Sequence, residues 1–280
     1  MTEFVTSADG TRIAYEEVGE GPRVVVIGGL FCDRQRMDDL AGHLAEAFTV
    51  LNYDRRGRGE SGDTGPYAVE REIDDLAALI GAAGGSAMVY GHSSGAGLAL
   101  RAAASGLPIS RLVLHEPPYG QDDEESRASA QSLAERVRAA IESDRHGDAI
   151  ADFLSAIGLP TDMVGALRQN PAMLAVARTM PYDFEVMGDF TGGTIPEHFV
   201  RAVSIPTLVI AGGVSPDFFR STAERIAKLL PHGSLAVLDG HDHDAPGEVV
   251  APVVAEFLAA AVDEDRRGRP DLFIHSNLPA

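Results

Sequence analysis

The chain has 280 residues, a formal net charge of -19 at pH 7 and 45% hydrophobic residues. This length fits one large α/β domain that carries an insertion, and no apolar run is long enough to span a bilayer, so the composition excludes a transmembrane protein. The surplus of negative charge would repel phosphate backbones and anionic lipid surfaces, which argues against a nucleic acid or a membrane as the main partner.

The N-terminal segment, residues 1–9, lacks the basic start and apolar core of a signal peptide, and the single cysteine, Cys32, has no partner for an internal disulfide. Both features predict a cytoplasmic protein, and the sequence leaves open a homodimer. Runs of strand type over 2–6 and 12–17 flank Asp9-Gly10, a dipeptide suited to a tight turn, which predicts a hairpin at the start of the chain.

After this hairpin, short β-branched runs alternate with longer segments of helical period. This pattern is typical of strands and helices that are interleaved around a mostly parallel sheet. Buried strands are predicted over residues 24–27, 49–53, 87–90 and 111–115. Helices are predicted over 37–47, 69–83 and 95–105, each long enough to cross back over a parallel sheet.

The strand runs then disappear from residue 121 to residue 201, where helical segments over 129–143, 148–157 and 172–180 predict a cap. The α/β pattern resumes with a strand over 207–211, a helix over 218–230, a strand over 234–238 and a last helix over 246–262. We therefore predict a core of residues 1–119 and 202–263, a helical cap of residues 120–201 and a C-terminal tail of residues 264–280.

Two adjacent serines follow the strand predicted over 87–90, in the sequence GHSSGAG. A nucleophilic serine on a sharp turn from strand to helix needs small residues two positions before and two positions after it. Ser93 has Gly91 and Gly95 at these positions, whereas Ser94 would place the imidazole of His92 in the turn. Ser93 is therefore the predicted nucleophile, and Ser94 is predicted to donate its backbone N–H to an oxyanion. The alternative is a glycine-rich turn with an ordinary serine.

This strand, turn and helix resemble the G-x-S-x-G elbow of the α/β-hydrolase superfamily, and DRRGRGESG at 54–62 is similar to its D-x-R-G-x-G-x-S loop. The resemblance covers residues 6–262 and points to capped, serine-nucleophile members such as esterases, with haloperoxidases and epoxide hydrolases as neighbours. It implies the α/β-hydrolase fold, with a mostly parallel sheet of about eight strands, a helical cap and a substrate pocket between them. No cofactor and no metal are implied.

The turn after the first buried strand resembles the segment that supplies the oxyanion hole in this superfamily. The His-Gly pair common at this turn is Gly28-Gly29 here. The resemblance places Leu30 where a backbone N–H points into the hole. Because the main chain is the donor, the missing imidazole does not remove the hole, and the choice between Leu30 and Phe31 stays open.

A histidine must take the proton of the serine, and LDGHDHDAPGE offers two, His241 and His243, between the last strand and the last helix. His243 fits better, because it stands three residues after Gly240, as in the L-x-G-x-x-H pattern of related sequences. The alternatives are a solvated loop and a metal site, for which the surrounding sequence offers no further cluster of ligands.

The carboxylate that should orient this histidine is the least determined residue. The position where the superfamily carries it, after the strand over 207–211, holds Ser215, which cannot supply a negative charge. Asp217 lies two residues later but also suits the start of the next helix. Glu116, at the end of the strand over 111–115, occupies a second position that some superfamily members use. We choose Glu116, with Asp217 as the alternative.

These residues predict a serine hydrolase that acts on an ester, lactone or thioester of a small, apolar molecule. Ser93 would attack the carbonyl, His243 would move the proton, and Leu30 with Ser94 would hold the oxyanion. A non-hydrolytic reaction at the same site (cyclisation, acyl transfer, perhydrolysis or carbon–carbon cleavage) and a non-catalytic binding protein remain as alternatives. Phe, Met, Leu and Tyr side chains of the cap favour an apolar substrate.

Overall fold

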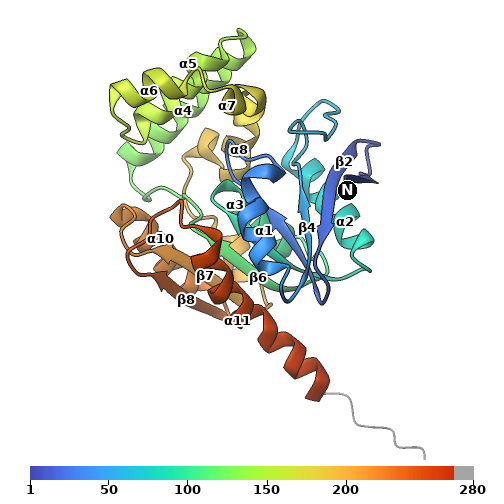
Figure 1. Ribbon diagram of the computed structural model, residues 1–280. Helices are drawn as coiled ribbons and strands as arrows, with labels where there is room; N and C mark the ends of the chain where they lie inside the picture. The colour runs from blue at the N-terminus through green and yellow to red at the C-terminus, as the bar shows by residue number, and fades with distance from the viewer. Residues whose placement is uncertain (268–280) are drawn as a thin grey trace, which may run out of the picture.

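The computed structural model describes residues 1–267, and its centre is one eight-stranded sheet in the order β1-β2-β4-β3-β5-β6-β7-β8 (Figure 1). The strands are β1 (Glu3–Thr6), β2 (Arg12–Val18), β3 (Arg23–Ile27), β4 (Thr49–Tyr53), β5 (Ala87–His92), β6 (Ile109–His115), β7 (Thr207–Gly212) and β8 (Gly233–Leu238). The β1–β2 hairpin is antiparallel and joins β4 antiparallel, whereas all other neighbours are parallel. The predicted fold class is confirmed, with small shifts at the strand ends.

Helices cover both faces of this sheet, which explains why its central strands are apolar without alternation. Helices α2 (Val69–Ala82), α3 (Ser94–Ala104) and α10 (Asp217–Leu229) cover one face, and α1 (Asp38–Leu44) and α11 (Gly247–Arg267) cover the other. Neighbouring side chains of β3 point to opposite faces. Val25 and Ile27 join the apolar cluster of the first face, whereas Val24 and Val26 join that of the second. All four side chains are fully buried.

Six α-helices lie between β6 and β7 in the chain: α4 (Glu124–Glu142), α5 (His146–Ala156), α6 (Thr161–Leu167), α7 (Pro171–Val176), α8 (Met180–Met187) and α9 (Glu197–Ala202). Helices α4 to α7 form a group beyond one end of the sheet, with α8 between this group and the core (Figure 1). They bury an apolar cluster of their own around Val137, Ile150 and Phe184. We call the helices α4 to α8 the cap.

Two cap helices differ from their predicted bounds. α4 begins at Glu124 instead of residue 129, because the side chain of Asp123 accepts a hydrogen bond from the Ser126 N–H and caps the helix there. The helix predicted over 172–180 is broken into α7, a short 3-10 turn and α8. Pro181 stands in the first turn of α8, where its missing N–H requires no partner, whereas a continuous helix would lose a hydrogen bond there.

The last helix is longer than predicted, since α11 continues to Arg267. The first residues of the predicted tail, 264–267, are therefore helical, and the prediction for 268–280 lies outside the described residues. Within residues 1–267, no helix has both the length and the hydropathy needed to cross a membrane.

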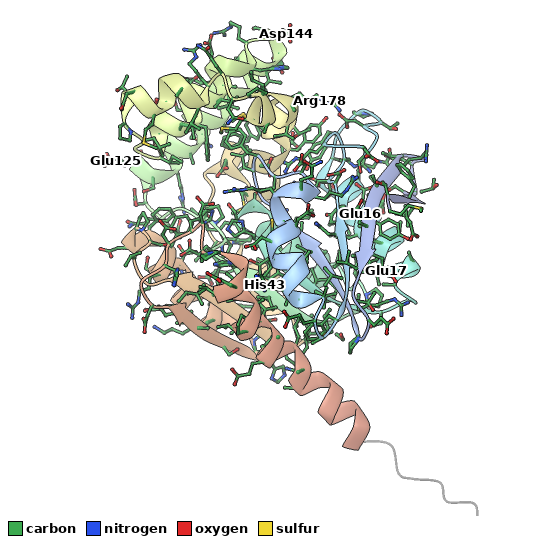
Figure 2. The ribbon with its side chains drawn as sticks, viewed as in Figure 1. Glu16, Glu17, His43, Glu125, Asp144 and Arg178 are labelled. Carbon is green, nitrogen blue, oxygen red and sulfur yellow. The ribbon has the colours of Figure 1, made fainter. Side chains whose placement is uncertain are left out.

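The cap is attached to the core by polar and aromatic contacts around α8. Figure 2 shows Arg178 on the side of the cap that faces the core. Its guanidinium lies 3.3 Å from the Asp63 carboxylate and donates a 2.9 Å hydrogen bond to the Gly57 carbonyl. The rings of Tyr182 and Tyr67 stack with centroids 3.7 Å apart. These contacts hold α8 against the loops that leave β4.

Candidate active site

Ser93 stands alone on the sharp turn between β5 and α3. Its φ of 57° and ψ of -126° lie in a region that non-glycine residues rarely adopt. The strained residue is held by the hydrogen bond from its N–H to the His115 carbonyl, at 2.9 Å. Ser94 already belongs to α3, is 3% exposed and donates its hydroxyl to Asp183 at 2.6 Å. Of the two serine hydroxyls, only that of Ser93 therefore remains on the turn.

The two glycines that flank this turn are required by contacts with backbone atoms. A Cβ atom on Gly91 would lie 2.4 Å from the Gly95 carbonyl oxygen, and one on Gly95 would lie 2.5 Å from the Ile27 carbonyl oxygen. Neither backbone can move aside without breaking the sheet or the helix. The sequence rule of small residues around the nucleophile therefore has a direct steric cause here.

His243 and Glu116, which are distant in the sequence, meet at the ends of their strands. His243 Nδ1 lies 2.7 Å from Glu116 Oε2, and the other carboxylate oxygen accepts a 2.6 Å hydrogen bond from the Gly212 N–H. Glu116 is fully buried. Burial by itself would raise the pKa of this carboxyl, but the hydrogen bonds from His243 and Gly212 outweigh it, so the pKa lies below its ordinary value.

Ser215 and Asp217 do not take this place. Ser215 is half-buried with its hydroxyl oxygen turned inward near Glu116, and it helps to lower the pKa of that carboxyl, although this hydroxyl forms no hydrogen bond of regular geometry. Asp217 is the first residue of α10, and among the described residues it makes no hydrogen bond to His243. Glu116 is thus the carboxylate that His243 contacts.

The imidazole of His243 packs against two other rings. The His92 ring centroid is 4.6 Å away and that of Phe219 is 4.8 Å away. His92 Nε2 also donates a 3.0 Å hydrogen bond to the His243 carbonyl oxygen. Burial lowers the pKa of His92 to about 4, so His92 is neutral at pH 7. The exposed fraction of the His243 side chain is 29%, which leaves this ring open to a reactant.

The turn that follows β3 approaches Ser93 closely. A Cβ atom on Gly29 would lie 2.7 Å from Ser93 Cβ, so only glycine fits there. Phe31 has a φ of 62°, and the turn is closed by a hydrogen bond from the Cys32 N–H to the Gly29 carbonyl. Within the described part of the chain, the backbone N–H groups of Leu30, Phe31 and Ser94 donate to no protein acceptor.

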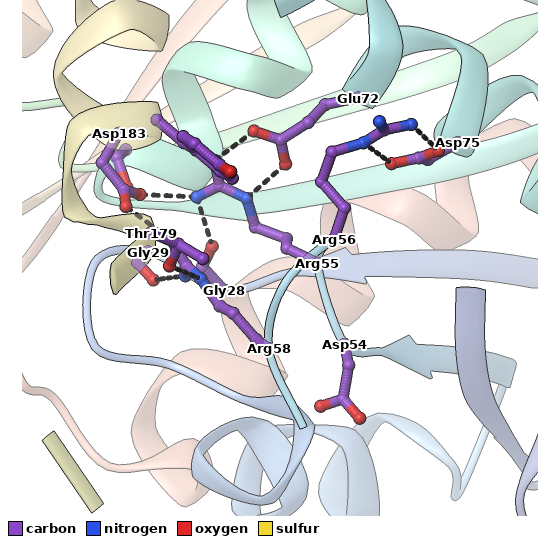
Figure 3. Close-up of polar contacts among 12 residues, drawn as sticks. Gly28, Gly29, Asp54, Arg55, Arg56, Arg58, Glu72, Asp75, Thr179 and Asp183 are labelled. Carbon is purple, nitrogen blue, oxygen red and sulfur yellow. Dashed lines mark hydrogen bonds and ion pairs between the residues drawn. The ribbon is translucent and has the colours of Figure 1, made fainter. Parts of the chain in front are cut away.

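Behind this turn, three buried arginines of the loop after β4 are paired with carboxylates (Figure 3). Arg56 is paired with Asp75 of α2 at 2.7 Å. Arg55 is paired with Glu72 of α2 at 2.7 Å and with Asp183 of α8 at 2.6 Å. Arg58 also pairs with Asp183. Each guanidinium has a buried counter-charge, as charges removed from water require.

A model of the alpha/beta hydrolase family matches residues 24–256. The chain belongs to the α/β hydrolase family. An α/β hydrolase of Sphaerobacter thermophilus is 49% identical in sequence, with a TM-score of 0.83, over 91% of this chain and 100% of that chain.

Two further relatives of this α/β hydrolase are also hydrolases. The 2-(acetamidomethylene)succinate hydrolase of Mesorhizobium japonicum is 28% identical over 87% of this chain and 90% of that protein. A thermophilic esterase of Thermogutta terrifontis is 25% identical, with a TM-score of 0.71, over 93% of this chain and 99% of that chain.

Sequence reasoning assigned no role to Asp183 or to His92, which both contact predicted site residues. Asp183 is one acidic residue within a helix of the cap, and an aspartate is usually exposed to solvent. The repeated arginines of DRRGRG were a signal that could have been used, because buried arginines imply buried carboxylates elsewhere in the chain.

We predict that Gly91→Ala destabilises this α/β hydrolase by about 2–3 kcal/mol, because the added methyl group would overlap the α3 backbone. Gly42→Ala is the matched control: a Cβ atom there meets nothing within 4 Å, and alanine should stabilise α1 by roughly 0.5–1 kcal/mol. Urea denaturation followed by circular dichroism measures both. Equal stabilities of the two variants would contradict the steric account.

Proposed function

We propose that this α/β hydrolase cleaves a carboxylic ester, lactone or thioester of an apolar small molecule through an acyl-enzyme on Ser93. The observation that carries the proposal is the 2.7 Å contact between His243 Nδ1 and a buried Glu116 carboxylate. With Nδ1 bound to the carboxylate, the proton of a neutral imidazole stays on Nδ1, and Nε2 is left as the base.

In this mechanism Ser93 Oγ attacks the substrate carbonyl carbon while His243 Nε2 takes the hydroxyl proton. The carbonyl oxygen becomes an oxyanion, and the ion pair with Glu116 stabilises the imidazolium. When the tetrahedral intermediate collapses, His243 returns the proton to the leaving oxygen or sulfur, and the acyl group stays on Ser93. A water molecule then repeats the two steps and releases the acid.

The oxyanion would be held by backbone N–H groups of Leu30 and Ser94. Support comes from their lack of an acceptor within the described residues and from the close approach of Gly29 to the nucleophile. Ser94 is also the first residue of α3, and the N-terminus of a helix favours negative charge. Phe31 N–H is equally without an acceptor, so it remains the alternative to Leu30.

An apolar substrate is supported by what surrounds the turn after β3. Leu30 and Phe31 pack against the apolar cluster of the cap. The rings of Phe31 and Phe153 are 5.7 Å apart, and edge-to-face contacts continue from Phe153 to Phe184 at 6.2 Å and from Phe184 to Phe190 at 6.5 Å. Aromatic rings of this kind suit an acyl chain or an aromatic acyl group.

An anionic acyl group is disfavoured by the pairing of the nearby arginines. The relative from Mesorhizobium japonicum acts on a succinate, which carries negative charge. In this chain the guanidiniums behind the oxyanion turn, Arg55 and Arg58, are already neutralised by Glu72 and Asp183. A substrate carboxylate would therefore be desolvated without a free counter-charge from this network.

We expect a fluorophosphonate probe to form an adduct on Ser93, because the base and the oxyanion donors activate this hydroxyl. Ser93→Ala should abolish the adduct and lower ester hydrolysis by at least about 10³-fold. Ser94→Ala is the matched control and should keep the adduct, since its backbone N–H is unchanged. Mass mapping of the adduct in the wild type and in both variants shows which serine carries it. A folded wild type without an adduct would favour a non-catalytic binding protein.

Glu116→Gln should lower kcat by about 10²–10⁴-fold, because a neutral amide neither stabilises the imidazolium nor fixes the tautomer. Asp217→Asn should keep kcat within about threefold, since the helix-starting position tolerates asparagine. Steady-state kinetics on one chromogenic ester compare the two. Full turnover by Glu116→Gln together with loss in Asp217→Asn would reverse the assignment of the acid.

The choice of acyl group is tested with two p-nitrophenyl esters that share a leaving group. We expect kcat/KM for the butyrate ester to exceed that for the hemisuccinate ester by at least about tenfold, because an unpaired carboxylate is expensive to desolvate. A preference for the hemisuccinate would overturn the proposed substrate class while leaving the mechanism in place.

A further inference from the structure

Asp183 of the cap is linked to both halves of the proposed oxyanion hole, directly to Ser94 and through Arg58 to the turn after β3. It lies on α8, is 3% exposed, and accepts hydrogen bonds from Ser94 Oγ and Arg55 Nη1, each at 2.6 Å, and from Arg58 Nη2. Burial alone would raise the pKa of this carboxyl, but the charges of Arg55 and Arg58 lower it, so Asp183 is an anion.

The first half of the hole is the turn after β3, which Arg58 holds from behind. Arg58 Nη1 donates to the Gly29 carbonyl at 2.6 Å and to the Cys32 carbonyl at 3.1 Å. The Gly29 carbonyl and the Leu30 N–H belong to one planar trans peptide, in which they point in opposite directions. By holding this carbonyl, Arg58 determines the direction of the Leu30 N–H.

The second half is the start of α3. The Ser94 hydroxyl is bound to Asp183, while the Ser94 N–H is the other proposed oxyanion donor. A hydrogen bond to the side chain fixes the first turn of α3 relative to α8. Asp183 thus orients the Leu30 donor through Arg58 and the Ser94 donor through the hydroxyl.

From this geometry, and building on the proposed function, we propose that Asp183 is a positioning residue that fixes the oxyanion hole from the cap, so that the hole is aligned only when α8 is docked on the core. It does not touch the substrate. Donors aimed in advance at the developing charge stabilise a transition state more than a ground state. Asp183 should therefore affect kcat and leave KM nearly unchanged.

The test compares Asp183→Asn with Asp75→Asn. Asp75 is a matched control, because it is 1% exposed and also pairs with an arginine of this loop, Arg56. The hydrogen bonds of Arg56 go to Asp75, Asp9 and the Arg71 carbonyl, and none of these groups belongs to the proposed oxyanion hole. Both substitutions keep the side-chain volume and remove one buried charge, so a merely structural effect would be shared by the two variants.

For Asp183→Asn we expect kcat on p-nitrophenyl butyrate to fall about 100-fold with KM within about threefold, and phosphonylation of Ser93 by the fluorophosphonate probe to slow by a similar factor. For Asp75→Asn we expect both rates to stay within about threefold of wild type. Equal losses in the two variants, or a rise of KM alone in Asp183→Asn, would overturn the inference.

Ser94→Ala gives a second measurement that stands if Asp183→Asn does not fold. It removes only the hydroxyl that reaches Asp183, and we expect kcat to fall about tenfold with KM unchanged, because one of the two links is lost. An unchanged kcat would contradict the inference. A wild-type protein that the probe does not label would overturn the proposed function and this inference with it. If the wild type is labelled but Asp183→Asn and Asp75→Asn have equal rates, only the inference is overturned.

Discussion

The close approach of α3 to the ends of β5 and β3 is the constraint on which the rest of the structure depends. A methyl group on Gly91 or Gly95 would overlap a backbone carbonyl, so the strand and the helix meet at a distance that only glycine permits. This contact holds Ser93 in its strained conformation and exposes one hydroxyl at the sheet edge. The same approach brings Gly29 against Ser93, so the proposed nucleophile and the proposed oxyanion turn are positioned by one packing contact.

The second requirement is charge compensation within the loop after β4. Its buried arginines are acceptable only with buried carboxylates, and these come from two places: α2 supplies Glu72 and Asp75, and α8 supplies Asp183. Because Asp183 belongs to the cap, moving α8 away from the core would leave Arg58 without its counter-charge. For this reason α8 is tied to the core more firmly than the outer cap helices, whose contacts are mainly with one another.

The position of the acid follows from the order of the parallel strands. β7 lies between β6 and β8, so a carboxylate at the end of β6 must reach past β7 to meet a histidine that follows β8. Glu116 does so with a φ of 47° and with the Gly212 N–H as its support. Ser215, in the loop after β7, has no charge to offer, and its hydroxyl has no hydrogen-bond partner among the described residues.

The sequence by itself determined the order of strands and helices, the cap between β6 and β7, and the turn around Ser93, because each of these depends on residues close together in the chain. It favoured Glu116 over Asp217 as the acid but could not place either one against His243, since Glu116 and His243 are 127 residues apart and only the folded sheet sets the distance between them. The arginines of DRRGRG indicated that buried carboxylates must exist, but nothing in the sequence pointed to Asp183 as one of them, because its surroundings are supplied by the tertiary contact between α8, the arginine loop and α3. Local patterns decide elements and turns, whereas buried charge pairs are decided by which elements meet.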